Sequence, residues 1–237
     1  MIMLVDTKYR SHTIEIMDDL DLSGEVLIDA LDQLATINKL LGGNQVTLNG
    51  LKKILEDQPK DKTISIIDLG CGSGDMLRKV ADYGRENGYT FKLIGVDANQ
   101  ATIDYANQLA TNYPEIAFIK EDILTEEFKT HTYDIAMCTL FLHHFDDKVA
   151  LNLLQTLLKN AKMGILVNDL HRHRLAYYLF KLVTLGIKND MTKNDGLLSI
   201  LRAFKRKDLE RFSKEIKHKS TISWHWAFRY QWIIQKS

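Results

Sequence analysis

The chain has 237 residues, of which 45% are hydrophobic and 26% are charged, a composition typical of a folded globular protein with a sizeable core. Its 31 basic residues balance its 31 acidic residues, which argues against a partner selected by net charge, such as a nucleic acid or a membrane surface. Two cysteines make no disulfide framework, and the start "MIMLVDTKYRSH" lacks the order of a secretory signal, so we expect a cytoplasmic protein.

Residues 1–58 are predicted to be helical. In "DLSGEVLIDALDQLATINKLLGG" the apolar residues recur along one helical face, with Ser23 as the N-cap and Gly42-Gly43 as the stop. A short helix, "LNGLKKILED", follows. The polar stretch "DQPKDKT" marks the predicted boundary, so we divide the chain into an N-terminal helical extension or lid (1–58) and one main domain (59–237).

From this boundary on, short apolar strands alternate with helices. The first strand, "ISIIDLG", is β-branched and apolar, which suits a strand buried on both faces. Alternation of this length is typical of an α/β fold with a parallel sheet and helices on both faces. The predicted strands span 64–70, 91–99, 116–123, 133–140 and 164–170, and the helices between them span 76–86, 100–112 and 148–160.

After the fifth strand the pattern changes. The helical stretch "RLAYYLFKLVTLG" carries a stripe of Leu175, Tyr178, Leu179 and Leu182, which we expect in the core or over a substrate. The polar segment "IKNDMTKNDGLL" (187–198) is predicted to be a loop that opens and closes over the site. The stretches "KSTISWHW" and "FRYQWIIQ" have no helix between them, so we predict a terminal hairpin that joins the sheet antiparallel.

The stretch "IIDLGCGSGDML" places Gly70, Gly72 and Gly74 between the first strand and the next helix. Such a turn lets a ligand approach the backbone closely. In the dinucleotide fingerprint G-x-G-x-x-G a pyrophosphate lies on the helix N-terminus, but here the third glycine comes one residue early. Asp68 and Asp75 flank the turn, and their negative charge favours an ammonium or sulfonium group over a pyrophosphate. The turn therefore predicts a cationic ligand.

Two further acids complete a nucleoside site. Asp97 ends the second strand about twenty residues after the glycines, where an acid accepts hydrogen bonds from both ribose hydroxyls. Asp122 ends the third strand in "KEDI", within reach of an adenine ring. A nucleoside with a cationic tail is S-adenosylmethionine, which is the predicted cofactor.

At these residues the chain resembles the class I S-adenosylmethionine-dependent methyltransferases, over residues 60–237. "DLGCGSGD" is similar to the family's glycine-rich motif, "GVDAN" to its ribose-binding acid, "KEDI" to its adenine-binding motif, and "YDIAMCTLFLHHF" to its fourth strand and loop. The resemblance implies a Rossmann-like seven-stranded sheet in the order 3-2-1-4-5-7-6 with strand 7 antiparallel, in agreement with the predicted hairpin.

The resemblance also implies which residues bind the cofactor. It assigns Asp68 and Gly70 to the methionine portion, Asp97 to the ribose, Asp122 with Ile123 to the adenine, and Leu140 to a place near the methyl group. The full set of implied cofactor contacts is Asp68, Gly70, Cys71, Gly72, Gly74, Asp97, Ala98, Asp122, Ile123 and Leu140.

Histidines follow the fourth and fifth strands, at the edge of the sheet where the substrate should bind. Methyl transfer depends on alignment of the reacting atoms, and an acidic hydroxyl must also lose a proton, which a histidine can take. His171 is the first candidate for a base or substrate contact, followed by His144 and His143. For His143 and His144 the alternative is support of the loop.

Other features limit the chemistry. For "EIMDDLD" (15–21), Arg10 and Asn38 the alternatives are a place that faces the cofactor and a solvated helix face, of which we expect the solvated face. Neither the Cys/His spacing nor the scattered acids suggest a metal site, so no metal is expected. "CTLF" stands where methyltransferases of exocyclic amines carry an Asn/Asp-Pro-Pro-Tyr motif, so the chain resembles the bacterial small-molecule branch, which includes quinone and phenol methyltransferases.

The predicted function is methylation of a small, partly apolar acceptor, by preference at the oxygen of a phenol- or quinol-like hydroxyl. The alternatives are C- or N-methylation of a small molecule, a module that binds S-adenosylmethionine without turnover, and a nucleotide-dependent oxidoreductase, which the glycine spacing and Asp75 disfavour. We expect a monomer or homodimer with no nucleic-acid or membrane partner.

Overall fold

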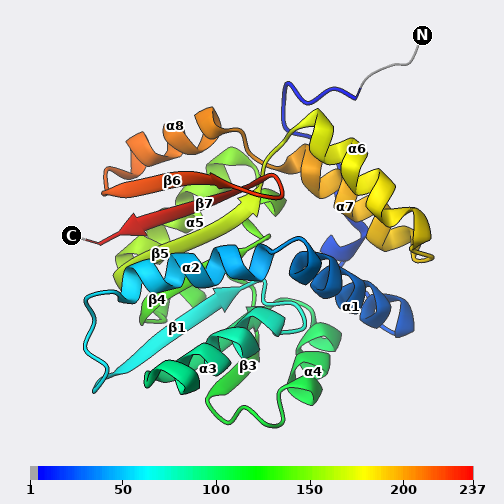
Figure 1. Ribbon diagram of the computed structural model, residues 1–237. Coiled ribbons are helices and arrows are strands. Elements are labelled where there is room, and N and C mark those ends of the chain that lie inside the picture. Colours follow the sequence, from blue (N-terminus) through cyan, green and yellow to red (C-terminus); the bar gives the residue numbers. More distant parts are fainter. Residues whose placement is uncertain (1–4, 237) are drawn as a thin grey trace.

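The computed structural model describes residues 5–236, and a seven-stranded sheet in the order β3-β2-β1-β4-β5-β7-β6 forms its centre (Figure 1). β7 runs antiparallel to β5 and β6, and the pairs among β1 to β5 are parallel. This order confirms the predicted Rossmann-like fold. The strands are β1 (Thr63–Leu69), β2 (Thr90–Asp97), β3 (Ile116–Lys120), β4 (Tyr133–Thr139), β5 (Ala161–Leu170), β6 (Ser220–His225) and β7 (Arg229–Gln235).

Helices cover both faces of the sheet because its central strands are apolar on both sides. Ile66 and Ile67 of β1 point to opposite faces, and both are buried. Ile66 packs in the core beneath α2 (Gly43–Leu55) and α3 (Asp75–Asn87). Ile67 packs in the core beneath α5 (Asp147–Asn160) and α8 (Arg206–Ile216). α4 (Gln100–Leu109) contacts β2 and β3 near the edge of the sheet.

Three helices lie together beyond the carboxyl ends of the strands: α1 (Glu25–Leu40), α6 (Arg174–Val183) and α7 (Asp190–Arg202) (Figure 1). The prediction of a polar loop at 187–198 is wrong, because α7 begins within it. The side chain of Asn189 caps α7 by accepting the backbone N–H groups of Met191 and Thr192. Gly196 lets α7 approach α6, since a Cβ there would lie 2.2 Å from the ring of Phe180.

The first two helices also begin at other residues than predicted. α1 follows Gly24 and has no side-chain cap, so Ser23 is not its N-cap. α2 begins at Gly43, directly after the left-handed Gly42, and packs against β5 and β7. The division of the chain at residue 58 stays a prediction.

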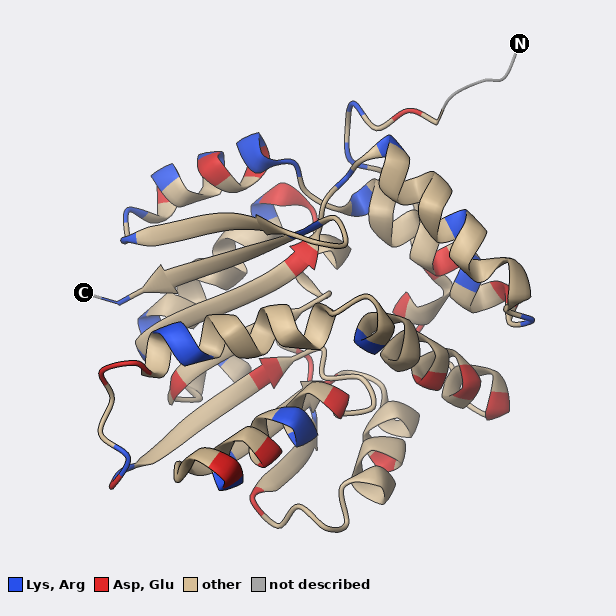
Figure 2. Cartoon of the chain, in the orientation of Figure 1, with Lys and Arg blue, Asp and Glu red and all other residues tan. Residues whose placement is uncertain are grey.

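Charged residues of both signs are spread over the elements (Figure 2), and along α8 basic and acidic positions alternate. None of the helices within residues 5–236 has the length and apolar character that a membrane crossing needs.

Candidate active site

A cavity of about 800 Å³ opens at the carboxyl ends of β1, β2, β4 and β5. The glycine turn and the ends of these strands form one wall. α1, α6, α7 and the segment 14–20 form the other walls. With the exception of Gly74, every residue predicted to bind the cofactor or to act in catalysis lines this cavity. The volume lies within the range of ordinary ligand sites.

The glycine turn has the tight geometry that its sequence predicts. Gly70, Gly72 and Gly74 have φ angles of 62°, 53° and 73°, in the left-handed region that favours glycine. A Cβ at Gly70 would lie 2.1 Å from the ring of Phe141, so the turn packs against the loop after β4. Beside Gly72 the nearest atom to such a Cβ is a methyl of Leu31 at 3.7 Å, so this part of the turn faces open space.

Acidic side chains surround that space, as the sequence predicts. Burial raises the pKa of Asp68 well above its usual value, and the carboxylates of Asp75 and Asp97 raise it further. Asp68 Oδ1 is buried and accepts no hydrogen bond from residues 5–236. A cationic ligand that donates hydrogen bonds would satisfy this oxygen and favour its ionised form. The ammonium group of S-adenosylmethionine therefore fits this wall.

Asp97 is bonded to the turn itself. Its Oδ2 accepts the backbone N–H of Gly72 at 3.2 Å, and its Oδ1 accepts that of Asn99 at 3.0 Å. Burial raises the pKa of Asp97, while these backbone hydrogen bonds lower it. The carboxylate thus joins the end of β2 to the glycine turn at the edge of the cavity.

The other predicted cofactor residues lie around the same space. Cys71 and Ile123 are buried, and Ala98 and Asp122 follow β2 and β3 in the cavity wall. Leu140 has a φ of 54°, and its N–H donates to the carbonyl of Asn168 at 2.8 Å, which fixes the turn after β4. Their roles toward a cofactor stay predictions.

His143 belongs to a short 3-10 helix, Leu142–His144, and is held by Asp169 at the end of β5. Its Nδ1 lies 2.6 Å from Asp169 Oδ1, and its backbone N–H donates to Asp169 Oδ2 at 3.0 Å. Because an ionised carboxylate only accepts, Nδ1 carries the proton. Nε2 is buried and has no hydrogen-bond partner in residues 5–236, and in the neutral ring it is the nitrogen that accepts.

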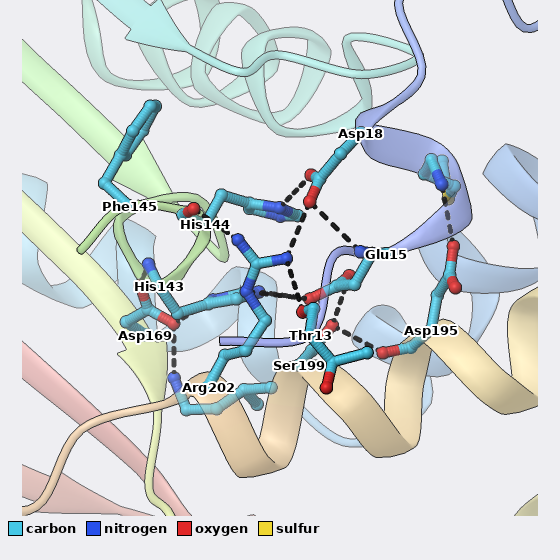
Figure 3. Close-up of polar contacts among 12 residues, drawn as sticks. Thr13, Glu15, Asp18, His143, His144, Phe145, Asp169, Asp195, Ser199 and Arg202 are labelled. Atoms are coloured by element: carbon cyan, nitrogen blue, oxygen red, sulfur yellow. Dashed lines mark hydrogen bonds and ion pairs between the residues drawn. The ribbon is translucent and has the colours of Figure 1, made fainter. Parts of the chain in front are cut away.

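The N-terminal segment supplies a second layer of acids beside these histidines (Figure 3). Glu15 Oε1 lies 3.9 Å from His143 Nε2, and Asp18 Oδ1 lies 2.6 Å from His144 Nδ1. Burial raises the pKa of Glu15 to about 7. The expectation that residues 15–21 are solvated is therefore wrong for Glu15, and it is also wrong for Asn38, since both side chains are buried in the cavity wall.

Distant residues hold this segment in place. Asp195 of α7 accepts the backbone N–H groups of Ile16 and Met17 at 3.0 and 2.9 Å. Arg202 of α7 donates to Asp18 at 2.6 Å. Arg10 is not solvated either, because its Nη2 donates to the carbonyls of His143 and Phe145.

His171 lies in a different environment. Its Nδ1 accepts the indole N–H of Trp224 at 3.2 Å, so its other nitrogen carries the proton in the neutral ring. Burial, together with the charge of His173, lowers the pKa of His171 to about 4. His171 therefore lines the cavity as a neutral imidazole whose free lone pair is already engaged.

The apolar stripe on α6 is only partly buried. Leu175 and Leu182 are 51% and 61% exposed, so the expectation of a core position is wrong for both. Leu179 of the stripe does line the cavity, together with Ala176 and Phe180.

Within residues 5–236, Glu15, His143 and His144 form a group that could hold a metal ion, since one ligand atom from each lies within 4.8 Å of the others. However, Arg202 Nε lies 3.7 Å from Glu15 Oε1, so a cation already faces this carboxylate. The expectation of no metal stays a prediction.

Comparison with known proteins agrees with this geometry. Residues 66–164 match the family model described as a methyltransferase domain. The chain is 35% identical to 2-phytyl-1,4-naphtoquinone methyltransferase of Nostoc over 45% of this chain and 46% of that protein. It is 28% identical to ribosomal RNA small subunit methyltransferase A of Macrococcus caseolyticus over 60% of this chain and 45% of that protein. The chain thus spans less than half the length of these relatives.

Solved structures share the fold over most of the chain. The plantazolicin methyltransferase BpumL in complex with SAH superposes with a TM-score of 0.66 at 16% identity, over 87% of this chain and 89% of that chain. The sheet order, the glycine turn and the match over residues 66–164 point to the same family. The chain therefore contains a methyltransferase domain over residues 66–164, in agreement with its predicted resemblance to the class I S-adenosylmethionine-dependent methyltransferases.

Proposed function

We propose that the chain transfers a methyl group from S-adenosylmethionine to a small, partly apolar acceptor, by preference to the oxygen of a phenol- or quinol-like hydroxyl. The observation that carries this proposal is the buried pair of His143 and Asp169. His143 lines the same cavity as the acids of the predicted cofactor site, and its Nε2 has no hydrogen-bond partner within residues 5–236, so it can accept a proton when the ring is neutral.

The cofactor end of the cavity is defined by charge and by the open side of the glycine turn. Asp68 would accept from the ammonium group of the methionine portion, and Asp97 would accept from the ribose hydroxyls. Asp122 and Ile123 would border the adenine. Bound S-adenosylmethionine supplies a methyl group on a cationic sulfur.

The acceptor end is mainly apolar. Leu179, Phe180 and Ile200 contribute to its walls. An acceptor with an aromatic or aliphatic body would bury apolar surface there, and the Nostoc relative is named for a naphthoquinone. Glu15 and Asp18 come from residues 1–58, which supports the role of this extension as a lid.

Among the predicted histidines, His143 is the best candidate for the general base. Its Nε2 would take the hydroxyl proton as the acceptor oxygen attacks the methyl carbon, and Asp169 would stabilise the resulting imidazolium. Glu15, 3.9 Å from Nε2, adds a carboxylate beside that charge. His171 is less suited as a base because Trp224 donates to its lone pair.

Turnover of S-adenosylmethionine with a panel of phenols, quinols and carboxylic acids tests this proposal. We expect S-adenosylhomocysteine to form with at least one hydroxylated aromatic acceptor and its formation to fall sharply in His143→Ala. Tight binding of S-adenosylhomocysteine without product from any acceptor would favour a binding module. A higher Tm with NADH but not with S-adenosylmethionine would favour an oxidoreductase. Product mass spectra separate O- from C- or N-methylation.

A further inference from the structure

Arg229, the first residue of β7, is a buried cation without hydrogen-bond partners for two of its nitrogens. It is 2% exposed and lines the cavity. Its Nε and Nη1 are buried and donate to no atom of residues 5–236. Arginine does not lose its charge in proteins, so this guanidinium is buried as a cation.

Two other buried arginines of the chain show what a satisfied guanidinium looks like. Arg172 donates to the carbonyls of Thr7 and Ala203 and to the carboxylate of Asp208. Arg202 donates to the carbonyl of Thr13 and to Asp18 and also reaches the carbonyl of His144. Arg229 lacks such a set, although burial without partners costs free energy.

The acid whose charge acts on Arg229 does not fill this role. Asp169 lies close enough to favour the charged form of Arg229. Its oxygens, however, accept hydrogen bonds from the backbone and ring of His143 and from the backbone N–H of Leu170. Asp169 therefore balances part of the charge of Arg229 and leaves its N–H groups free.

The chain makes room for the guanidinium at the start of α2. A Cβ at Gly43 would lie 2.7 Å from Arg229 Cζ and 1.9 Å from Asn38 Oδ1, and Gly43 itself does not have a positive φ. Glycine is therefore needed here for space. The 13-residue helix α2 begins at this point with no side-chain cap, so its free N–H groups add positive potential.

We propose that Arg229 binds a carboxylate group that enters the cavity. This inference rests on the proposed function, which gives the carboxylate two sources: an acidic group on the acceptor, or the methionine carboxylate of the cofactor. Arg229 lies on β7, beyond β5 and on the far side of β4 from the glycine turn, which favours the acceptor. Planar carboxylates match the fork of a guanidinium and form two parallel hydrogen bonds.

Two matched pairs of probes separate these sources by calorimetry. S-adenosylhomocysteine carries the methionine carboxylate, and its decarboxylated analogue lacks the carboxylate but keeps the amino group. 4-Hydroxybenzoate carries an acceptor carboxylate, and 4-hydroxybenzamide is its neutral analogue. We expect the wild-type protein to prefer the acid in at least one pair by about tenfold or more, and Arg229→Met to lose that preference. Loss in the first pair assigns the cofactor and loss in the second assigns the acceptor.

The proposal is overturned if the wild-type protein prefers the acid in neither pair, or if Arg229→Met keeps the preference. Binding is measured without turnover, so failure of the methyl transfer itself would leave these results readable. Arg172→Met serves as the control for folding. We expect it to lower the Tm of the ligand-free protein, and we expect Arg229→Met to leave the Tm unchanged or raise it, because it removes an unpartnered buried charge. If Arg229→Met fails to fold, Arg229→Lys takes its place: it keeps the charge but not the paired donors, so we expect the preference for the acid to weaken, and an unchanged preference overturns the proposal.

Discussion

One carboxylate, that of Asp169, holds both the ring and the backbone of His143. Its Oδ1 lies 2.6 Å from the ring Nδ1, and its Oδ2 accepts the backbone N–H at 3.0 Å. Burial raises the pKa of Asp169, but the charge and hydrogen bond of His143 lower it below its usual value overall. The two contacts fix the tautomer and the direction of the imidazole together.

Asp169→Asn should therefore separate catalysis from binding. The amide can donate to Nδ1 and so favours the tautomer with its proton on Nε2, which removes the acceptor from the cavity. We expect turnover to fall by roughly 10²- to 10⁴-fold, the usual contribution of a general base. Affinity for S-adenosylhomocysteine, measured by calorimetry, should change little.

His143→Ala should lose about as much, and the double variant little more, because the two residues act as one unit. His171→Ala is the control and should retain most of the activity. If turnover falls more in His171→Ala than in His143→Ala, His171 and not His143 is the general base.

The sheet and the cofactor wall were predictable because their signals are local. The glycine turn, Asp97 and Asp122 each lie at the end of a strand that its own residues define. The carboxyl ends of parallel strands lie at the same edge of the sheet. A parallel sheet therefore places these acids near one another, whatever the contacts made by distant residues. The antiparallel β7 followed from the missing helix between two β-branched stretches.

The acceptor wall could not be predicted in this way. Glu15 faces His143 across 128 positions of the sequence, and its place depends on Asp195 and Arg202, which hold the segment around it. The stretch "EIMDDLD" is acidic and reads as a solvated face. In the sequence Arg229 is an ordinary strand residue. Only the structure shows that its guanidinium occupies the space left by the missing side chain of Gly43.

Gly70→Ala and Gly72→Ala should have different consequences, although both residues have a positive φ. At Gly72 the new methyl meets no side chain closer than 3.7 Å, so we expect only the left-handed strain of about 1–2 kcal/mol in the free energy of unfolding. At Gly70 the methyl would overlap the ring of Phe141, so the loss should be larger.

Gly72→Ala should weaken the binding of S-adenosylhomocysteine strongly, although it lowers the free energy of unfolding in urea only slightly. The methyl group occupies the open side of the turn, so affinity should fall much more than stability. Equal affinity in Gly72→Ala and the wild-type protein would show that the ligand does not approach the turn there.

Asp97→Asn should weaken the binding of the whole nucleoside. The amide loses the charge that strengthens hydrogen bonds to the ribose, and its NH₂ group faces either the N–H of Gly72 or that of Asn99. We expect affinity to fall about tenfold or more for both S-adenosylhomocysteine and 5′-methylthioadenosine. The exposed Asp104→Asn is the control, and a loss confined to one ligand would argue against a ribose contact.

Cofactor binding should release a proton from Asp68. Burial and the neighbouring Asp75 and Asp97 raise its pKa in the free protein, and a bound ammonium group would lower it again. Affinity for S-adenosylhomocysteine should therefore rise with pH until Asp68 is ionised in the free protein as well. Calorimetry in phosphate and in Tris should give different heats, because the buffer takes up the released proton.

Asp68→Asn should abolish that difference between buffers and weaken binding. 5′-Methylthioadenosine lacks the amino group, so its binding should release fewer protons from Asp68 than the binding of S-adenosylhomocysteine does. Identical heats in both buffers for the wild-type protein would mean that Asp68 is already ionised before the ligand binds.

The pKa of Glu15 predicts how folding stability depends on pH. Burial raises this pKa from 4.5 to about 7, against the opposing effects of His144, Ser199 and Arg202. Between these two pH values the folded chain keeps a proton that the unfolded chain has released. The stability contributed by Glu15 is therefore fully present below pH 4.5, falls as pH rises, and is lost above pH 7.

The glutamine in Glu15→Gln cannot titrate. As the pH rises from 4.5 to 8, the free energy of unfolding of this variant should therefore increase relative to that of the wild-type protein. We expect a relative gain of about 3 kcal/mol, measured by urea unfolding at intervals across this range. The exposed Glu86→Gln should run parallel to the wild-type protein and controls for the loss of one charge. If the Glu15→Gln curve also runs parallel, Glu15 is ionised in the folded chain throughout, and the cation of Arg202 outweighs its burial.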